Sequence, residues 1–262
     1  MVRLIDISPL VSERIRVWPG DVPYSRTASA SREAGDSVSL SALRTTLHLG
    51  AHLDAPSHCA ADAPGIDAME LGTCYGDCQV VAVAKRSGRI RPGDLDVPVE
   101  APRVLFRTGS FPDPERWTPD FASLSAELIE SLHAQGVRLV GIDTPSIDPQ
   151  ESEDLPAHRA AADHDIAILE GLVLEHVTPS RYTLAAFPLR LEGADASMFV
   201  DANWVLTPGE STADAAFARV RTTVASLGAE VVTLAPDRHD ALVALVSHVP
   251  HLTAATLMGL AS

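Results

Sequence analysis

The sequence contains only three cysteines, Cys59, Cys74 and Cys78, among its 262 residues. An odd number of thiols cannot pair fully within one chain, and Cys74-x-x-x-Cys78 has no second cysteine pair with which to complete a structural zinc site. We therefore expect small buried thiols. No apolar run approaches the roughly 18 residues that span a bilayer, and the first residues show no signal-peptide pattern. These absences predict a cytoplasmic protein with no membrane partner.

Positive charge is also scarce. The chain has 20 Lys and Arg residues against 35 Asp and Glu residues, which gives a formal net charge of −15. Such a charge repels a phosphate backbone or an anionic lipid surface, so we expect no nucleic-acid partner. Hydrophobic residues make up 46% of the chain, which at this length is enough for a full core.

Two catalytic motifs are absent. No Gly-x-Ser-x-Gly segment occurs, so the chain lacks the nucleophile elbow of serine hydrolases. No Gly-x-Gly-x-x-Gly turn occurs either, so the backbone amides that bind a dinucleotide pyrophosphate are missing. We therefore exclude hydride transfer.

Short apolar or β-branched runs between turn residues predict several strands, and one amphipathic segment predicts a helix. The helix is expected over 121–133, where Phe121, Leu124, Leu128 and Leu132 share a face and Gly136 follows at the C-terminal end. The sequence therefore predicts a mixed α/β fold. The expected strands are Leu4–Ile7, Cys78–Ala84, Val104–Arg107, Leu139–Ile142 and Tyr182–Phe187.

The most informative segment runs from His48 to His58 and contains His48, His52, Asp54 and His58, all at even positions. An extended backbone would project all four side chains to one side and turn Leu49, Ala51 and Leu53 toward a core. A helix would separate Asp54 and His58 from the two other histidines, and Gly50 and Pro56 also disfavour one. We therefore expect a strand that bends at Pro56 and presents metal-binding groups along one wall.

Later sequence offers two more metal-binding side chains, His158 and Glu170. Glu170 lies among Ile168, Leu169, Leu172, Val173 and Leu174, where a buried carboxylate is costly unless a cation meets it. Three imidazoles and two carboxylates exceed what one tetrahedral zinc with an open position needs. They suit two ions that share bridging carboxylates.

Six segments occur in an order that is typical of one known family: Asp6-Ile-Ser-Pro-Leu, Val17-Trp-Pro-Gly-Asp21, His48-x-Gly-x-His-x-Asp-Ala-Pro-x-His58, Gly141-Ile-Asp-Thr-Pro-Ser146, Ile168-Leu-Glu-Gly-Leu172 and Leu189-Arg-Leu-Glu-Gly-Ala-Asp-Ala-Ser197. Through these segments the chain resembles, over about residues 1–197, the bacterial kynurenine formamidases (arylformamidases) of the cyclase-type metal-dependent hydrolases.

The resemblance implies a cyclase-like swivelling β/β/α fold with a mixed, barrel-like sheet, assembled as a homodimer or a dimer of dimers. It also implies two Zn²⁺ ions per subunit, with Mn²⁺ as the alternative that the ligand types leave open. One ion would be bound by His48, His52, Asp54 and Glu170. The other would be bound by Asp54, Glu170 and His158.

The implied reaction is hydrolysis of N-formyl-L-kynurenine, an aryl formamide, to L-kynurenine and formate, as in tryptophan degradation. Metal-activated hydroxide would attack the formyl carbon, with His58 as general acid and base. Trp18 would stack on the substrate's aryl ring, although a core tryptophan beside a turn is an alternative interpretation. Two alternative functions remain. The chain could be a related cyclic-amide hydrolase, such as an isatin hydrolase, or a fused binding or assembly protein without catalytic activity.

The remaining residues, 198–262, predict a separate appendage. We expect a helix over Thr212–Leu227, a strand over Glu230–Leu234 and a helix from about Pro236 to Val246. This segment resembles the end of the nucleotide-binding domain of prephenate dehydrogenases. We interpret His239, His248 and His251 within it as polar positions without a metal.

Overall fold

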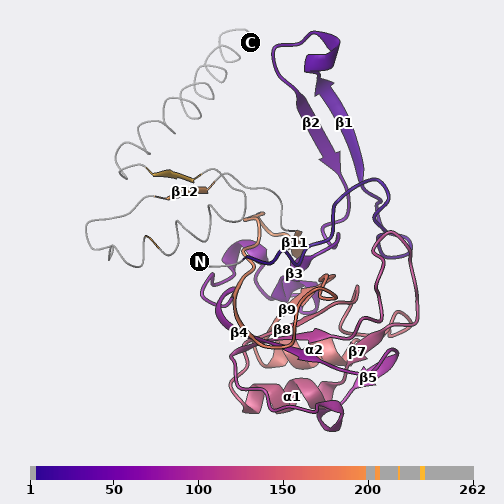
Figure 1. Cartoon of the computed structure of the whole chain (residues 1–262), viewed down its shortest axis with the longest axis vertical. Coiled ribbons are helices and arrows are strands. Elements are labelled where there is room, and N and C mark those ends of the chain that lie inside the picture. The colour runs from indigo at the N-terminus through magenta and orange to yellow at the C-terminus, as the bar shows by residue number, and fades with distance from the viewer. Residues whose placement is uncertain (1–3, 199–203, 207–217, 219–230, 234–262) are drawn as a thin grey trace. The chain divides into compact units, whose positions relative to one another are not determined.

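The computed structural model describes residues 4–198, 204–206, 218 and 231–233 (Figure 1). The chain separates into two compact units, one of Ile7–Phe199 and one of Met1–Asp6 with Val200–Ser262. Each unit is considered by itself below.

The larger unit is built on a seven-stranded mixed sheet with the strand order β10-β4-β6-β8-β9-β3-β11. The four central strands, β4, β6, β8 and β9, are parallel, while β10 and β3 pair antiparallel with their neighbours. β11 pairs antiparallel with β3 at the edge. The strands are β3 His52–Asp54, β4 Tyr75–Ala82, β6 Arg103–Arg107, β8 Leu139–Ile142, β9 Ala167–Glu170, β10 Arg181–Ala185 and β11 Ala196–Met198.

Two helices, α1 (Ala126–Ala134) and α2 (Pro156–Asp163), pack against each other and against the central strands (Figure 1). The main core joins them to one face of the sheet through fully buried side chains such as Phe106, Ile129 and Ile142. The strands β8 and β9 are mostly apolar along their length because all of their residues are buried. The mixed α/β fold predicted from the sequence is confirmed.

Most of the predicted elements are present, with shifted ends. The strand Leu139–Ile142 has the predicted bounds, and the runs at 78–84, 104–107 and 182–187 correspond to β4, β6 and β10. The prediction of a strand at Leu4–Ile7 is wrong, because residues 4–7 form no strand. The helix predicted over 121–133 corresponds to α1, which begins five residues later, at Ala126. Ala122–Leu124 form the short strand β7, and Ser125 caps α1 by accepting a hydrogen bond from the backbone N–H of Leu128.

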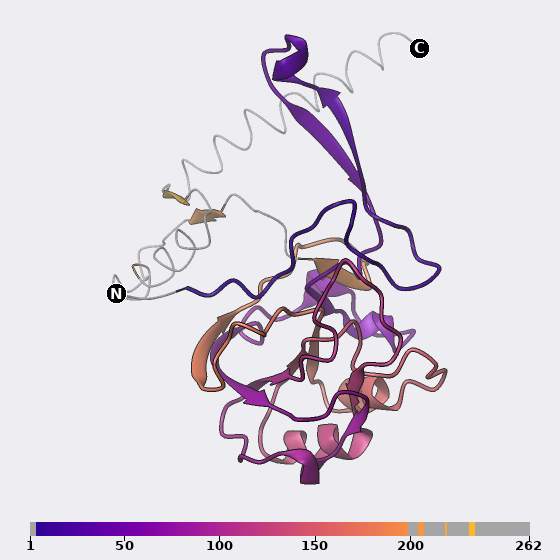
Figure 2. The ribbon, with the colours of Figure 1, turned by 45° about the vertical axis from the view of Figure 1, so that its right-hand side comes forward.

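A long hairpin projects from this unit (Figure 2). It consists of β1 (Ser25–Ala30) and β2 (Leu40–Arg44), and nearly every residue on both strands is exposed to solvent. A second small pair joins β5 (Gly88–Ile90) and β7 in parallel. Four short 3-10 helices complete the unit: η1 Arg32–Ala34, η2 Pro56–His58, η3 Ile66–Ala68 and η4 Pro92–Asp94.

In the smaller unit, β12 (Trp204–Leu206) and β13 (Val231–Thr233) pair in parallel. The strand predicted over 230–234 corresponds to β13. The predicted helices over 212–227 and 236–246, and the histidines at 239, 248 and 251, lie outside the described residues. Within the described part of the chain, no helix is long and apolar enough to cross a membrane.

Two glycines allow the strands that flank the candidate site to approach each other. Gly171 follows β9 with a left-handed φ of +68°, and a Cβ built on it would lie 1.9 Å from the backbone oxygen of Gly50. Gly50, with a φ of +60°, lies in the turn before β3. Only glycine fits at position 171, both for its conformation and for the space available.

We predict that Gly171→Ala lowers the free energy of unfolding by well over 2 kcal/mol, since it combines left-handed strain of about 1–3 kcal/mol with a backbone clash. Gly136→Ala is the matched control, because Gly136 has a φ of +83° but no atom within 4 Å of its added Cβ. Urea denaturation of both variants measures the difference. Equal losses of stability would show that the contact between the two glycines does not constrain the fold.

Candidate metal centre

The segment 48–58 differs from the single strand predicted for it. Only His52–Asp54 form a strand, because Gly50 adopts a left-handed turn before it and Pro56 begins the 3-10 helix η2 after it. The predicted facing of the side chains is nevertheless confirmed, since Leu49, Ala51 and Leu53 are all buried in the core. The polar residues at the even positions, His48, His52, Asp54 and His58, lie close together at one site.

The fold brings His158 and Glu170 to the same place. Antiparallel pairing of β3 with β9 sets His52 directly opposite Glu170. His158 lies in the first turn of α2. His52, Asp54, His158 and Glu170 are each at most 4% exposed.

The donor atoms form two groups, and each carboxylate contributes one oxygen to each group. In the first group, His48 Nδ1 lies 3.2 Å from Asp54 Oδ1, and His52 Nε2 lies 3.4 Å from Asp54 Oδ1 and 3.5 Å from Glu170 Oε2. In the second, His158 Nε2 lies 3.6 Å from Asp54 Oδ2 and 3.4 Å from Glu170 Oε1. Ligands at zinc distances in a tetrahedron are separated by about 3.3 Å. Both groups therefore have the spacing of metal ligands.

Several of these atoms have no hydrogen-bond partner. Within the described part of the chain, both carboxylate oxygens of Asp54 and the Nε2 of His48 are buried and make no hydrogen bond. A buried carboxylate without hydrogen bonds is costly, and a cation is the group that compensates it best. The donor set therefore fits divalent metal ions.

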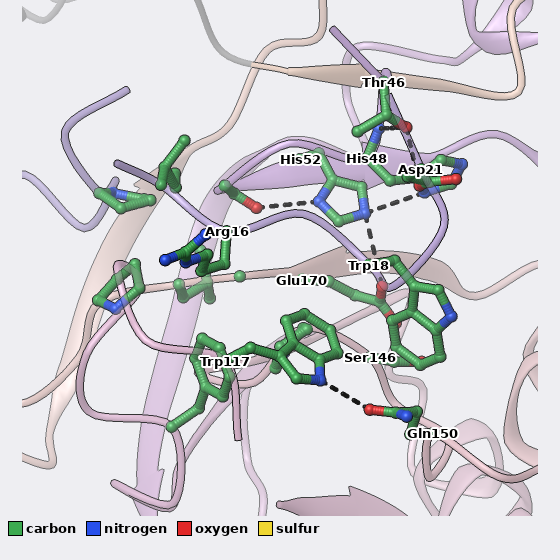
Figure 3. A pocket seen from close by; sticks show the side chains of 18 of the residues that line it. Arg16, Trp18, Asp21, Thr46, His48, His52, Trp117, Ser146, Gln150 and Glu170 are labelled. Atoms are coloured by element: carbon green, nitrogen blue, oxygen red, sulfur yellow. Dashed lines mark hydrogen bonds and ion pairs between the residues drawn. The ribbon is translucent and has the colours of Figure 1, made fainter. Parts of the chain in front are cut away.

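The orientation of the His52 ring is fixed by its other nitrogen. Its Nδ1 lies 3.0 Å from the carbonyl oxygen of Gly50, which can only accept, so Nδ1 carries the proton. This bond directs Nε2 toward His48 and Glu170 (Figure 3).

The electrostatics of the site show how strongly it attracts positive charge. Burial alone would lower the pKa of His52, but the neighbouring carboxylates of Asp54 and Glu170 raise it to about 10. Burial would raise the pKa of Asp54, but the neighbouring imidazoles of His158, His48 and His52 hold it well below its usual range. The carboxylates therefore stay ionised and hold protons on the imidazoles, and metal ions would take the place of those protons.

His58 differs from the other histidines of the site. Its ring centroid lies 4.3 Å from that of His48 and 5.8 Å from that of His158. Burial lowers its pKa, and the attraction of Asp54 only partly offsets this effect. His58 is therefore a neutral imidazole at pH 7 that can accept a proton.

The site opens into a cavity of about 500 Å³ whose outer wall is aromatic. Trp18 contacts Trp117 edge to face with ring centroids 5.4 Å apart (Figure 3). Phe111 also contacts Trp117, with ring centroids 5.7 Å apart. Trp117 is held by a hydrogen bond of 2.7 Å from its indole N–H to Gln150. Trp18 thus lines the cavity and packs against a second tryptophan, and its stacking on a substrate's aryl ring stays a prediction.

Sequence reasoning missed Trp117, Phe111 and Asp148. The two aromatic residues lie in a Pro-rich loop that shows no periodicity, so no pattern pointed to them. Asp148 follows the Gly141–Ser146 segment by two residues and precedes His158 by ten. It makes a hydrogen bond of 2.8 Å with His158 Nδ1, and bonds to His158 and Arg89 keep its pKa low despite burial.

All three cysteines are free. The expectation of small buried thiols is confirmed for Cys74 and Cys78, whereas Cys59 is only partly buried. Burial raises the pKa of Cys74 to about 11 and that of Cys78 to about 12. These two thiols therefore remain protonated and are packing residues.

Comparisons with known proteins point to one family. A family model described as "Putative cyclase" matches residues 5–149. A kynurenine formamidase from Sphingopyxis alaskensis is 42% identical over 200 residues, which cover 75% of this chain and 95% of that protein.

Solved structures agree. A structure described as a predicted metal-dependent hydrolase from Bacillus stearothermophilus superposes with a TM-score of 0.63 at 26% identity, covering 74% of this chain and 93% of that one. Isatin hydrolase A from Labrenzia aggregata has the same TM-score of 0.63 at 19% identity, covering 74% and 90%, and so shares the fold. From the family match and the formamidase relative together, the chain belongs to the putative cyclase family.

Proposed function

We propose that the protein hydrolyses N-formyl-L-kynurenine to L-kynurenine and formate with two divalent cations per subunit. The observation that carries this proposal is the way Asp54 and Glu170 each direct one oxygen to each of two imidazole groups. The relative of 42% identity, named a kynurenine formamidase, supports the choice of substrate.

His48, His52, Asp54 and Glu170 would hold one cation, and His158 with the same two carboxylates would hold the other. Three of the five proposed ligands are imidazole nitrogens, which suit zinc better than manganese. We therefore propose zinc ahead of manganese. Cations bound by these residues would lower the pKa of water and polarise a carbonyl oxygen.

We propose that His58 moves the proton. It is not among the ligands proposed for either cation, and its ring lies close to those of His48 and His158. As a neutral imidazole it accepts a proton from the attacking water, and as imidazolium it delivers that proton to the aniline nitrogen that leaves.

We propose that the lining of the cavity binds the rest of the substrate. Trp18, Trp117 and Phe111 offer an aromatic surface to the aryl ring. Among the described residues that line the cavity, Arg16 is the only Lys or Arg. Its Nε donates to the backbone oxygen of Glu115, which leaves the outer guanidinium nitrogens for the substrate's carboxylate.

The domain division follows the same evidence. We propose that residues 1–197 form the hydrolase domain and that 198–262 are an appendage, because the formamidase relative is matched almost throughout its length by 200 residues of this chain. We also infer a cytoplasmic location, since all three thiols are free.

We further propose a homodimer in which the β1–β2 hairpin contacts a second copy of the chain. A two-stranded hairpin is marginally stable alone in water, yet this one exposes Leu40 and Leu43 at 57% and 50%. Residues 25–44 contain three Arg and two acidic residues, whereas the whole chain carries −15. A second copy therefore offers complementary charge.

The metal and the proton carrier can be separated by mutation. We predict that His52→Ala loses bound zinc and lowers kcat/KM by about 10³-fold or more, the equivalent of several kcal/mol of transition-state stabilisation. His58→Ala keeps its zinc and lowers kcat by about 10²–10⁴-fold. Zinc content by mass spectrometry and formamide hydrolysis measure both effects.

His133→Ala is the control, since His133 stacks on His164 away from the site and should change neither quantity. Full activity in His52→Ala, or in protein stripped of metal by a chelator, would refute the proposed function.

Arg16 provides a test of the substrate. We predict that Arg16→Gln raises the KM for N-formyl-L-kynurenine about tenfold or more, because a charge-assisted hydrogen bond contributes about 1.5–3 kcal/mol. The KM for N-formylaniline, which has no carboxylate, stays unchanged. Arg14→Gln is the control, since Arg14 pairs with Glu115 at the surface. An equal change for both substrates would contradict the role of Arg16.

The homodimer is tested by sedimentation. We predict that the wild-type chain sediments as a dimer and that Leu40→Asp with Leu43→Asp produces a monomer, because burying the two new charges is costly. Leu71→Asp, at a residue 53% exposed elsewhere on the surface, should leave the dimer intact. A monomeric wild-type protein, or a dimeric double variant, would exclude the hairpin as the interface.

A further inference from the structure

We propose that Asp148 is a positioning residue that fixes the ring of His158 for metal binding, an inference that rests on the proposed function only in taking His158 as a metal ligand. Asp148 is fully buried (0% exposed) in the loop between β8 and α2. It lies behind His158, on the far side of the ring from Asp54 and Glu170.

The geometry assigns the two ring nitrogens of His158 to different partners. Nδ1 lies 2.8 Å from Asp148 Oδ2, whereas Nε2 lies 3.4 Å from Glu170 and 3.6 Å from Asp54. A carboxylate can only accept, so the proton of a neutral ring is drawn to Nδ1. The lone pair of Nε2 then faces the metal position, as in other carboxylate–histidine–metal arrangements.

Both carboxylate oxygens of Asp148 are themselves fixed by hydrogen bonds. Oδ2 accepts from the backbone N–H groups of Ala157 and His158 at 3.1 and 3.0 Å, which ties the carboxylate to the start of α2. Arg89 on β5 pairs with Oδ1, and its guanidinium also donates to the backbone oxygen of Leu124 and to Ser152. One side chain thus sets both the position of the helix end and the rotation of the ring.

In the first group of ligands, a backbone carbonyl takes the role that the Asp148 carboxylate has for His158. Gly50 O accepts from His52 Nδ1 at 3.0 Å. The two anchors differ in charge, since the backbone carbonyl is neutral and Asp148 is ionised. His158, the only imidazole of the second group, therefore receives the more basic support, which strengthens it as a ligand.

The variant Asp148→Asn separates the anchoring role from size and packing. An amide has one oxygen and one NH₂ group. Either the NH₂ group faces Arg89, donor against donor, or it faces His158 Nδ1 and forces the ring proton onto Nε2, where it blocks the metal. The amide fits neither arrangement, although its volume is unchanged.

We expect Asp148→Asn to weaken zinc binding about 10–100-fold at the site that contains His158, measured by competition with a chromophoric chelator on the full-length folded protein. Excess zinc should restore the activity of this variant toward that of the wild type. Asp143→Asn is the matched control, because Asp143 is also a buried carboxylate that accepts backbone hydrogen bonds, from Thr108 and Gly109, but it contacts no proposed ligand. It should lose stability and retain zinc affinity.

A second measurement uses the wild-type protein and so does not depend on the folding of a variant. Proton–nitrogen spectra of the histidine rings in the zinc-loaded protein should place the ring proton of His158 on Nδ1, with the signal assigned by its loss in His158→Gln. A ring proton on Nε2 would overturn the proposal, and so would equal zinc affinity in Asp148→Asn and the wild type. Normal zinc binding without formamide hydrolysis would instead refute the substrate and leave the role of Asp148 supported.

Discussion

The structure depends on two ionised carboxylates, Asp54 and Glu170, that are buried side by side. Moving one carboxylate out of water costs several kcal/mol, and a second one beside it adds repulsion. Three imidazoles surround the pair, and bonds from them hold the pKa of each carboxyl below its ordinary value even though burial acts in the opposite direction. A site with this surplus of buried negative charge is stable only when cations or protons occupy it. The same property that makes it costly to fold makes it suitable for metal ions.

The fold meets this requirement with rigid elements. Antiparallel pairing of β3 with β9 fixes His52 opposite Glu170, and the first turn of α2 brings His158 to the second oxygen of each carboxylate. The close contact of Gly50 with Gly171 sets the separation of the two loops that carry these ligands. Because protein interiors are close-packed, such a contact does not relax by small increments. The positions of the proposed ligands are therefore defined by the sheet and helix themselves.

Chemistry and recognition are divided between different parts of the chain. His58, whose pKa is lowered by burial, remains available for proton transfer while the other histidines face the carboxylates. The aromatic wall is assembled from two loops far apart in sequence, around Trp18 and around Trp117. Binding residues on loops can vary while the metal ligands stay on the scaffold. This division is consistent with one fold serving both the formamidase relative and isatin hydrolase A from Labrenzia aggregata, whose structure has the same fold.

The sequence by itself determined the mixed α/β fold and named the histidines and carboxylates that the structure gathers into one site, because their spacing and apolar surroundings are local properties. It misjudged the backbone between His48 and His58, where a left-handed glycine and a 3-10 helix replace most of the expected strand. The side chains still converge, since Leu49, Ala51 and Leu53 must reach the core. Only the tertiary structure decided which oxygen of Asp54 and Glu170 faces which imidazole, and only it revealed Asp148 and Trp117. Those relations join segments that are distant along the chain, and packing rather than local pattern brings them together.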